Sequence, residues 1–283
     1  MTRRMCAVLA VVLLATIALA TAERPAEAAG PSFQTVHFNI CSRKCTESLP
    51  VPGATNTNYG MNPIAGFLDV ANNHKGWPRI ISLNEVCSSA AWVFVANLPP
   101  NAYSVEWRIT AHRPPGCTDY GNIIAVRTLD KPASDASRFS IGYGAPTPPP
   151  SDTTSEARGA ACAKMMVYFE WTLACSTHLA NGSASHSESD TLRSVLNSSS
   201  SGLSVMGLGD FNLEPSSSHM GEWQSAGYVD ALVGYTWTYE GNPHIHIDYS
   251  WFKTTYLAGP DPGGTAYSSA SDHSMLWSPI HFK

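Results

Sequence analysis

Short apolar runs separated by turn-forming residues dominate this chain of 283 residues. Its 21 glycines and 20 prolines favour many short strands and turns over long helices. Runs typical of buried or half-buried strands cover residues 33–40, 80–83, 123–126, 165–173, 205–208 and 245–252. Helical patterns occur over residues 62–72, 88–97 and 187–197. The pattern predicts one α/β or α+β domain of many strands with helices between them.

The first 22 residues have the features of an export signal. Arg3 and Arg4 precede an apolar run over residues 7–20, and residues 20–22 form a small-residue cleavage site. The apolar run is shorter than the roughly 20 residues that a membrane-spanning helix needs. A second such site at residues 26–28 would place the cleavage as late as residue 29. We therefore expect a secreted protein with no stable membrane insertion after cleavage, and a single domain over residues 31–283.

Six cysteines remain after this leader is removed together with Cys6. An even number in an exported chain indicates three disulfides, for which 15 connectivities exist. We predict sequential pairing, because each bond then closes a local loop: Cys41–Cys45, Cys87–Cys117 and Cys162–Cys175. A zinc–thiolate site is disfavoured, since the first pair has no second close pair to complete four ligands.

The charge balance is acidic, with 17 Lys+Arg against 22 Asp+Glu and a net charge of −5. Removal of the leader takes away two arginines and no acid, which leaves 15 basic residues against 22 acidic ones. This balance argues against a surface coated in positive charge for non-specific nucleic-acid binding. It leaves open a small basic cleft, or a metal ion that supplies the positive charge.

Carboxylates, amides and imidazoles follow the apolar runs at the points where the strands end. They are Asn39 in T-V-H-F-N-I, Glu85 in I-S-L-N-E-V-C, His178 in C-S-T-H-L, Asp210 and Asn212 in G-D-F-N-L-E-P, Asp248 in H-I-D-Y, and Asp272 and His273 in S-D-H. Strand ends are where a sheet displays functional groups. Each segment alone also fits a turn or a solvated cap, so only their order and number together indicate a site.

Together with G-N-I-I-A-V-R, which contains Asn122, these segments resemble the ordered landmarks of the endonuclease/exonuclease/phosphatase superfamily, the deoxyribonuclease I-like enzymes. The resemblance covers essentially the whole chain after the leader. Asn84 replaces the usual Gln before Glu85, which is a small departure. The resemblance implies a four-layer α/β sandwich, with two packed mixed β-sheets flanked by helices and the active site at one edge.

Phosphodiester hydrolysis needs a neutralised anion, a water nucleophile and a stabilised leaving oxygen. Glu85 and Asn39 offer hard oxygen ligands for Mg²⁺, or for Mn²⁺ or Ca²⁺ in its place. Asp210, Asn212 and Asp272 are further oxygen ligands, which either hold a second ion or orient the attacking water.

His273 is the expected general base, and the resemblance pairs it with Asp248, which would fix its tautomer and stabilise the imidazolium. His178 would donate to a phosphate oxygen in the transition state. Asn122 and Arg158 match positions that face the scissile phosphate in relatives, although a surface salt bridge is an equal alternative for Arg158.

Several substrate classes stay open, because one scaffold hosts them all. We favour a monomeric nuclease, since Arg43 and Lys44, just after Asn39, could hold neighbouring phosphates of a nucleic acid. A phospholipase C or sphingomyelinase would need an exposed aromatic hairpin at the membrane surface. A phosphatase of inositol or sugar phosphates would need several cations around one ligand. A toxin-like subunit with the same fold is a further alternative.

Overall fold

The computed structural model describes residues 30–40, 61–112, 117–127, 137–143, 156–232, 237–240, 243–258, 264–266 and 271–283. The leader predicted over residues 1–22 lies outside this part of the chain. The predicted basic pair Arg43–Lys44 and the predicted disulfide Cys41–Cys45 lie outside it as well.

Two mixed β-sheets pack face to face within the compact unit Pro31–Lys283. The first sheet contains, in spatial order, β11 (Leu257–Ala258), β13 (Met275–Phe282), β1 (Ser32–Asn39), β2 (Ile80–Cys87), β4 (Asp119–Arg127) and β3 (Tyr103–His112), with β12 (Gly264–Ala266) beside β13. The second contains β5 (Ser137–Gly142), β6 (Gly159–Val167), β7 (Glu170–His178), β8 (Ser204–Asp210), β10 (Asp248–Lys253) and β9 (Tyr228–Asp230). Among these strands, β1–β2 and β7–β8 pair in parallel and the other neighbours are antiparallel.

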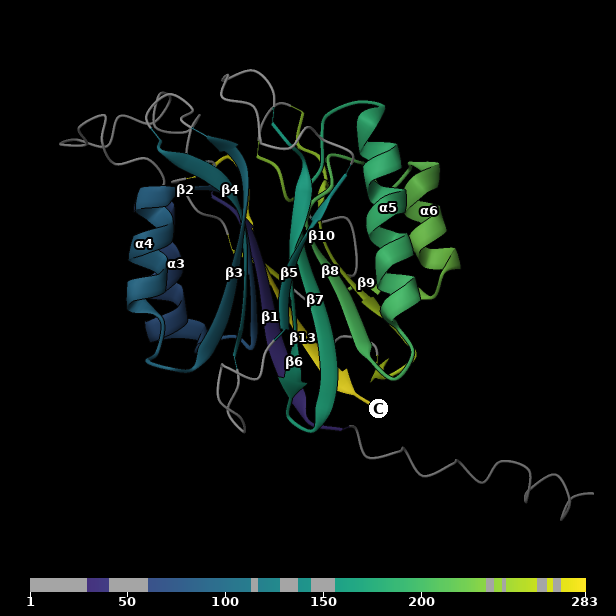
Figure 1. Cartoon of the computed structure of the whole chain (residues 1–283), viewed down its shortest axis with the longest axis horizontal. Helices are drawn as coiled ribbons and strands as arrows, with labels where there is room; N and C mark the ends of the chain where they lie inside the picture. The colour runs from purple at the N-terminus through teal and green to yellow at the C-terminus, as the bar shows by residue number, and fades with distance from the viewer. Residues whose placement is uncertain are drawn as a thin grey trace, which may run out of the picture. The chain divides into compact units, whose positions relative to one another are not determined.

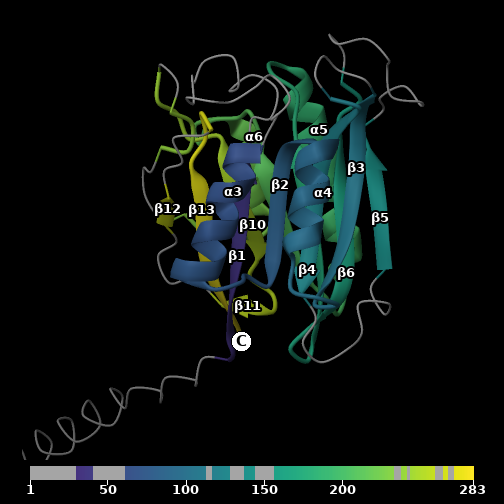
Figure 2. The same ribbon diagram turned by 90° about the vertical axis from the view of Figure 1, so that its left-hand side faces the viewer.

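Helices cover the outer face of each sheet (Figures 1 and 2). The first sheet carries α3 (Met61–Asp69), which continues as a π-helical segment η1 (Val70–Lys75), and α4 (Ser88–Asn97). The second sheet carries α5 (Ala184–Ser199) and α6 (Ser218–Ser225). The predicted four-layer α/β sandwich is confirmed. In the described part of the chain, none of these helices has the length and apolar character needed to span a bilayer.

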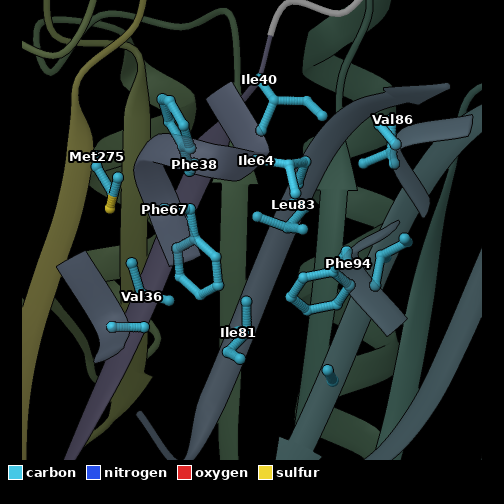
Figure 3. Close-up of a cluster of buried hydrophobic side chains, with 14 of the residues drawn as sticks. Val36, Phe38, Ile40, Ile64, Phe67, Ile81, Leu83, Val86, Phe94 and Met275 are labelled. Carbon is cyan, nitrogen blue, oxygen red and sulfur yellow. The ribbon is translucent and has the colours of Figure 1, made fainter. Parts of the chain in front are cut away.

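Three apolar cores hold the four layers together. The first lies between α3, α4 and the first sheet (Figure 3), where the rings of Phe67 and Phe94 are 5.9 Å apart. The second lies between the sheets and includes Ile124 and Leu208. The third lies under α5 and α6, and its centre is Trp223 stacked on Trp251 of β10 at 5.7 Å. Because the space between the sheets is filled with apolar side chains, polar groups buried there need hydrogen-bond partners inside the protein.

Successive side chains of β1 point to opposite faces of the first sheet. Val36 and Phe38 pack in the core under the helices, whereas His37 and Asn39 lie on the opposite face, towards the second sheet. All four side chains are fully buried. The inner face of β1 therefore changes from apolar to polar towards the end of the strand, where the predicted site residues lie.

The predicted single run over residues 165–173 is wrong, because it is the hairpin of β6 and β7. The chain reverses at Tyr168, which has a left-handed φ of 54°. The run contains no glycine or proline to mark the turn, and apolar residues of both strands are buried, so it resembles one continuous strand. The predicted helix over residues 88–97 coincides with α4.

Two disulfides occur in the described part of the chain. Cys87 bonds to Cys117, and Cys162 bonds to Cys175 directly across β6 and β7, so both of these predicted pairings are confirmed.

Substitution of Phe67, at the aromatic centre of the first core, should have a large effect on the free energy of unfolding. Phe67 is fully buried and contacts the rings of Trp77, Phe94 and Trp277. We expect Phe67→Ala to lower the free energy of unfolding by about 3–5 kcal/mol, because a buried ring is replaced by a cavity. Phe169→Ala is the control, since this ring is 84% exposed and its loss should cost less than about 0.5 kcal/mol. Urea unfolding measures both, and equal losses would contradict the assignment of this core.

Candidate active site

Neighbouring strands of the second sheet bring three predicted site residues into one row. His178 is the last residue of β7, Asp210 is the last residue of β8, and Asp248 is the first residue of β10. The strand register pairs Asp210 with both of the others, because β7 and β8 are parallel and β10 runs in the opposite direction. Asn39 ends β1 in the facing sheet, and its amide nitrogen donates to Asp210 Oδ2 at 3.1 Å.

Glu85 reaches the site through a backbone irregularity. The register between β2 and β4 shifts between Leu83 and Val86, and Glu85 itself has a left-handed φ of 57°. A non-glycine residue in this region is strained, and such strain is concentrated at functional sites. The bulge aims the carboxylate at the end of β1, where Oε1 accepts from Asn39 Nδ2 at 3.3 Å. It also lies 3.9 Å from His178 Nε2.

Gly209 allows β7 and β8 to approach closely beside the site. Its φ is +156°, and a Cβ atom there would lie 2.0 Å from the carbonyl oxygen of Thr177. Only glycine fits this close contact. The next residue in each strand then brings His178 Nε2 to 3.5 Å from Asp210 Oδ2.

His273 and Asp248 form a buried dyad. The Nδ1 atom of His273 lies 2.8 Å from Asp248 Oδ2, and both side chains are almost fully buried. Ser271 fixes the position of the segment before His273, because its hydroxyl donates to the Asn39 carbonyl and accepts from the His273 backbone N–H. The other ring nitrogen, Nε2, faces the acidic side of the site, 3.7 Å from Asp210 Oδ2.

The environment moves the pKa values of the dyad in opposite directions. Burial by itself lowers the pKa of His273, but the charge and hydrogen bond of Asp248 and the charge of Asp210 raise it to about 10. Burial raises the pKa of Asp248, but the charge of His273 and hydrogen bonds from two imidazoles outweigh this and hold the pKa well below its usual range. The pKa of Asp210 rises to about 7, through burial and then the charge of Asp248.

His178 is held neutral. Burial, followed by the charges of Arg158 and His273, lowers its pKa well below the usual range. The ring nitrogen that faces the carboxylates is Nε2, so we place the hydrogen there. A neutral imidazole with Nε2–H pointing into the site suits the predicted donation to a phosphate oxygen.

The other predicted residues are engaged in structural contacts near the site. Asn212, with a left-handed φ of 49°, donates its backbone N–H to Asp210 Oδ1 and its amide to the Leu179 carbonyl. Asn122 is buried and links the sheets, because it accepts from Asn84 and donates to the Gly159 carbonyl. Arg158 pairs with Glu156 at 2.7 Å. The phosphate-binding roles of Asn122 and Arg158 stay predictions.

A divalent cation fits the acidic side of this site. Glu85, Asp210 and Asp272 lie around the Asn39 amide and His273, and all offer hard oxygen atoms. Burial raises the pKa of Asp272 and of Asp210, and nearby carboxylates raise both further, although the charge of His273 opposes the shift. Asp248 is close to Asp210, but both of its oxygens already contact imidazoles, so it is a poor ligand. The carboxylates that could hold a cation are therefore Glu85, Asp210 and Asp272. The metal-ligand role of Asn39 stays a prediction, because its amide nitrogen faces Glu85 and Asp210.

Residues that support this site from inside the sandwich were not predicted from the sequence. His37 contacts Asp248, while Ser82, Asn84 and Ser176 continue the hydrogen-bond network between the sheets. The alternation of β1 was the available signal, because it places His37 on the same face as Asn39.

Comparisons with known proteins bear on the fold. No family model matches the sequence, and no curated protein matches it. An endonuclease/exonuclease/phosphatase from Bacteroides vulgatus superimposes with a TM-score of 0.67 at 15% identity, over 89% of this chain and 100% of that one.

Two further solved structures share the arrangement. ANGEL2, a 2',3'-cyclic phosphatase, has a TM-score of 0.65 at 12% identity, over 91% of this chain and 99% of that one. D. rerio TDP2 complexed with a single-strand DNA product has a TM-score of 0.59 at 15% identity, over 88% and 98%. The chain therefore has the fold of the endonuclease/exonuclease/phosphatase superfamily.

Proposed function

We propose that the protein is a metal-dependent phosphoester hydrolase that acts on phosphodiesters of nucleic acid. The observation that supports this is the juxtaposition of the His273–Asp248 dyad with the carboxylates of Glu85, Asp210 and Asp272. An imidazole base, a neutral imidazole donor and an oxygen-ligand cluster are what phosphodiester hydrolysis by water requires.

Each imidazole has a defined task in this mechanism. His273 Nε2 accepts a proton from the attacking water, and Asp248 holds the ring and stabilises the resulting imidazolium. His178 donates its Nε2–H to a phosphate oxygen as negative charge develops. A divalent cation bound by Glu85, Asp210, Asp272 and Asn39 would polarise the phosphate and neutralise its charge. Offsetting the charge of Asp210 and Asp272 also lowers the pKa of His273, which favours the neutral base.

One observation favours nucleic acid over lipid. The related folds include a 2',3'-cyclic phosphatase and an enzyme with a bound single-strand DNA product. The exposed aromatic residues do not discriminate between the two substrates. Phe169 lies in the turn before β7, at the opposite end of that strand from His178, but exposed Trp237 lies two residues before Tyr239, whose ring contacts His273. Export stays a prediction from residues 1–22, and the two disulfides support it, since disulfides persist in oxidising compartments.

A substrate panel with the purified protein tests this function. Plasmid DNA, RNA, sphingomyelin and inositol phosphates are incubated with Mg²⁺, Mn²⁺ or Ca²⁺, with and without EDTA. We expect cleavage of nucleic acid only when metal is present. Activity that survives chelation would overturn the metal requirement. Cleavage of sphingomyelin with DNA and RNA left intact would overturn the nuclease assignment and retain the hydrolase.

Substitution of the base tests the mechanism. We expect His273→Ala to lower kcat by at least roughly 10²-fold, because the proton acceptor for water is lost. Asp248→Asn should also lower kcat, since an amide cannot stabilise the imidazolium as a carboxylate does. The control is His186→Ala, on α5, which should retain the activity of the wild type. A His273→Ala enzyme with near-normal turnover would refute the base assignment.

The raised pKa of His273 also predicts how the metal-free protein responds to pH. The folded pKa of about 10 exceeds the ordinary value of 6.5, so the folded state binds the proton more tightly than the unfolded state. This contribution is complete below pH 6.5 and is lost as pH rises towards 10. In EDTA, the free energy of unfolding should therefore fall over this interval. His273→Gln should reduce the fall in urea-unfolding curves, and an unchanged pH slope in this variant would count against the assignment.

A further inference from the structure

His37 contacts the carboxylate of the dyad from the side opposite to His273. It is fully buried in β1, two residues before Asn39. Its Nε2 lies 3.0 Å from Asp248 Oδ1, while His273 Nδ1 lies 2.8 Å from Asp248 Oδ2. Asp248 is therefore held between two imidazoles, with one ring nitrogen on each oxygen.

The partners of His37 define which of its nitrogens carries the hydrogen. The low pKa of Asp248 means that its carboxylate is ionised and can only accept, so the ring nitrogens that face it must donate. His37 therefore has Nε2–H towards Asp248. The Ser82 hydroxyl lies 2.9 Å from Nδ1 and donates its own hydrogen to Ser176 Oγ.

The network continues into the second sheet and returns to the site. Ser82 Oγ lies 2.7 Å from Ser176 Oγ on β7. Asn84 donates to Ser176 Oγ at 3.2 Å, and its own Oδ1 accepts the backbone N–H of Asp210 at 2.9 Å. Buried side chains from β1, β2 and β7 thus connect the two acidic residues, Asp248 and Asp210, through groups that the solvent does not reach.

We propose that His37 is a positioning residue, which donates from Nε2 to Asp248 Oδ1 and thereby orients the carboxylate that holds His273. This proposal rests on the proposed function, in which His273 is the base. In the described part of the chain, Oδ1 of Asp248 has no other hydrogen-bond donor. Without His37, the buried carboxylate would turn towards whichever donors remain, and the ring that it holds would turn with it.

Two substitutions of His37 by an amide residue distinguish the effect of its hydrogen bond to Asp248 from the effect of its packing. The amide nitrogen of Gln occupies the place of a histidine Nε2, whereas that of Asn occupies the place of Nδ1. His37→Gln therefore keeps the donor to Asp248, and His37→Asn loses it while remaining polar. His37→Leu removes both contacts but fills the space.

We expect His37→Gln to retain most of the wild-type kcat on a nucleic-acid substrate with saturating Mg²⁺. His37→Asn and His37→Leu should lose roughly 10- to 100-fold in kcat with little change in KM, because the substrate-binding groups are untouched. The proposal would be overturned if all three variants lost kcat to a similar extent, or if none of them lost any.

Nitrogen-15 NMR of histidine-labelled protein supplies a readout that does not depend on activity. In the wild type we expect His37 to carry its hydrogen on Nε2, and His273 to carry one on Nδ1. The His273 signal should be retained in His37→Gln and altered in His37→Asn. A His37 hydrogen on Nδ1 alone would overturn the proposal even if no variant could be folded. If the wild type hydrolyses no phosphoester, the proposed function fails, while the NMR result still decides whether His37 orients Asp248.

Discussion

The ionised carboxylate of Asp248, buried between the two sheets, is the constraint on which the rest of the site depends. A buried charge is costly unless each oxygen is paired. Here the carboxylate belongs to β10 of the second sheet, while His37 on β1 and His273 just before β13 approach from elements of the first. The pairing is satisfied only when the sheet ends are aligned in one way. The interaction therefore links the packing of the sandwich to the geometry of the proposed active site.

The surroundings of His178 and His273 shift the pKa values of these two imidazoles in opposite directions. His178 lies near the Arg158 guanidinium and is largely desolvated, so its pKa falls. His273 is desolvated to a similar degree but contacts Asp248 directly, so its pKa rises. When neighbouring environments push two titratable groups apart, one is suited to accept protons and the other to donate a hydrogen bond while neutral. Burial alone would lower the pKa of both residues. The contact with the Asp248 carboxylate is therefore what separates the expected proton acceptor, His273, from the expected hydrogen-bond donor, His178.

Local patterns predicted much of the fold and the outline of the site. The alternation of β1, the apolar helix α4 and the polar residues at strand ends are visible in short windows of sequence. The partners of the supporting residues were not predictable in this way. The alternation of β1 places His37 on the face of Asn39, but its partner Asp248 lies 211 residues further along the chain, which no local pattern indicates. The left-handed backbone at Glu85 depends on the register between β2 and β4, which no local pattern records.

Four carboxylates in one pocket of an acidic protein repel a polyanionic substrate unless positive charge is added. The structure divides that charge into two parts. Asp248 is compensated internally, because imidazoles contact both of its oxygens. Glu85 and Asp210 accept from the Asn39 amide, and Asp210 also accepts from the Asn212 backbone N–H. Imidazole nitrogens lie only 3.5–3.9 Å from Glu85, Asp210 and Asp272, and this group of carboxylates would attract a cation. In the proposed mechanism the protein thus supplies its own counter-charge beside the base, and a metal ion held by the other carboxylates would reverse the sign of the field that a phosphate substrate meets.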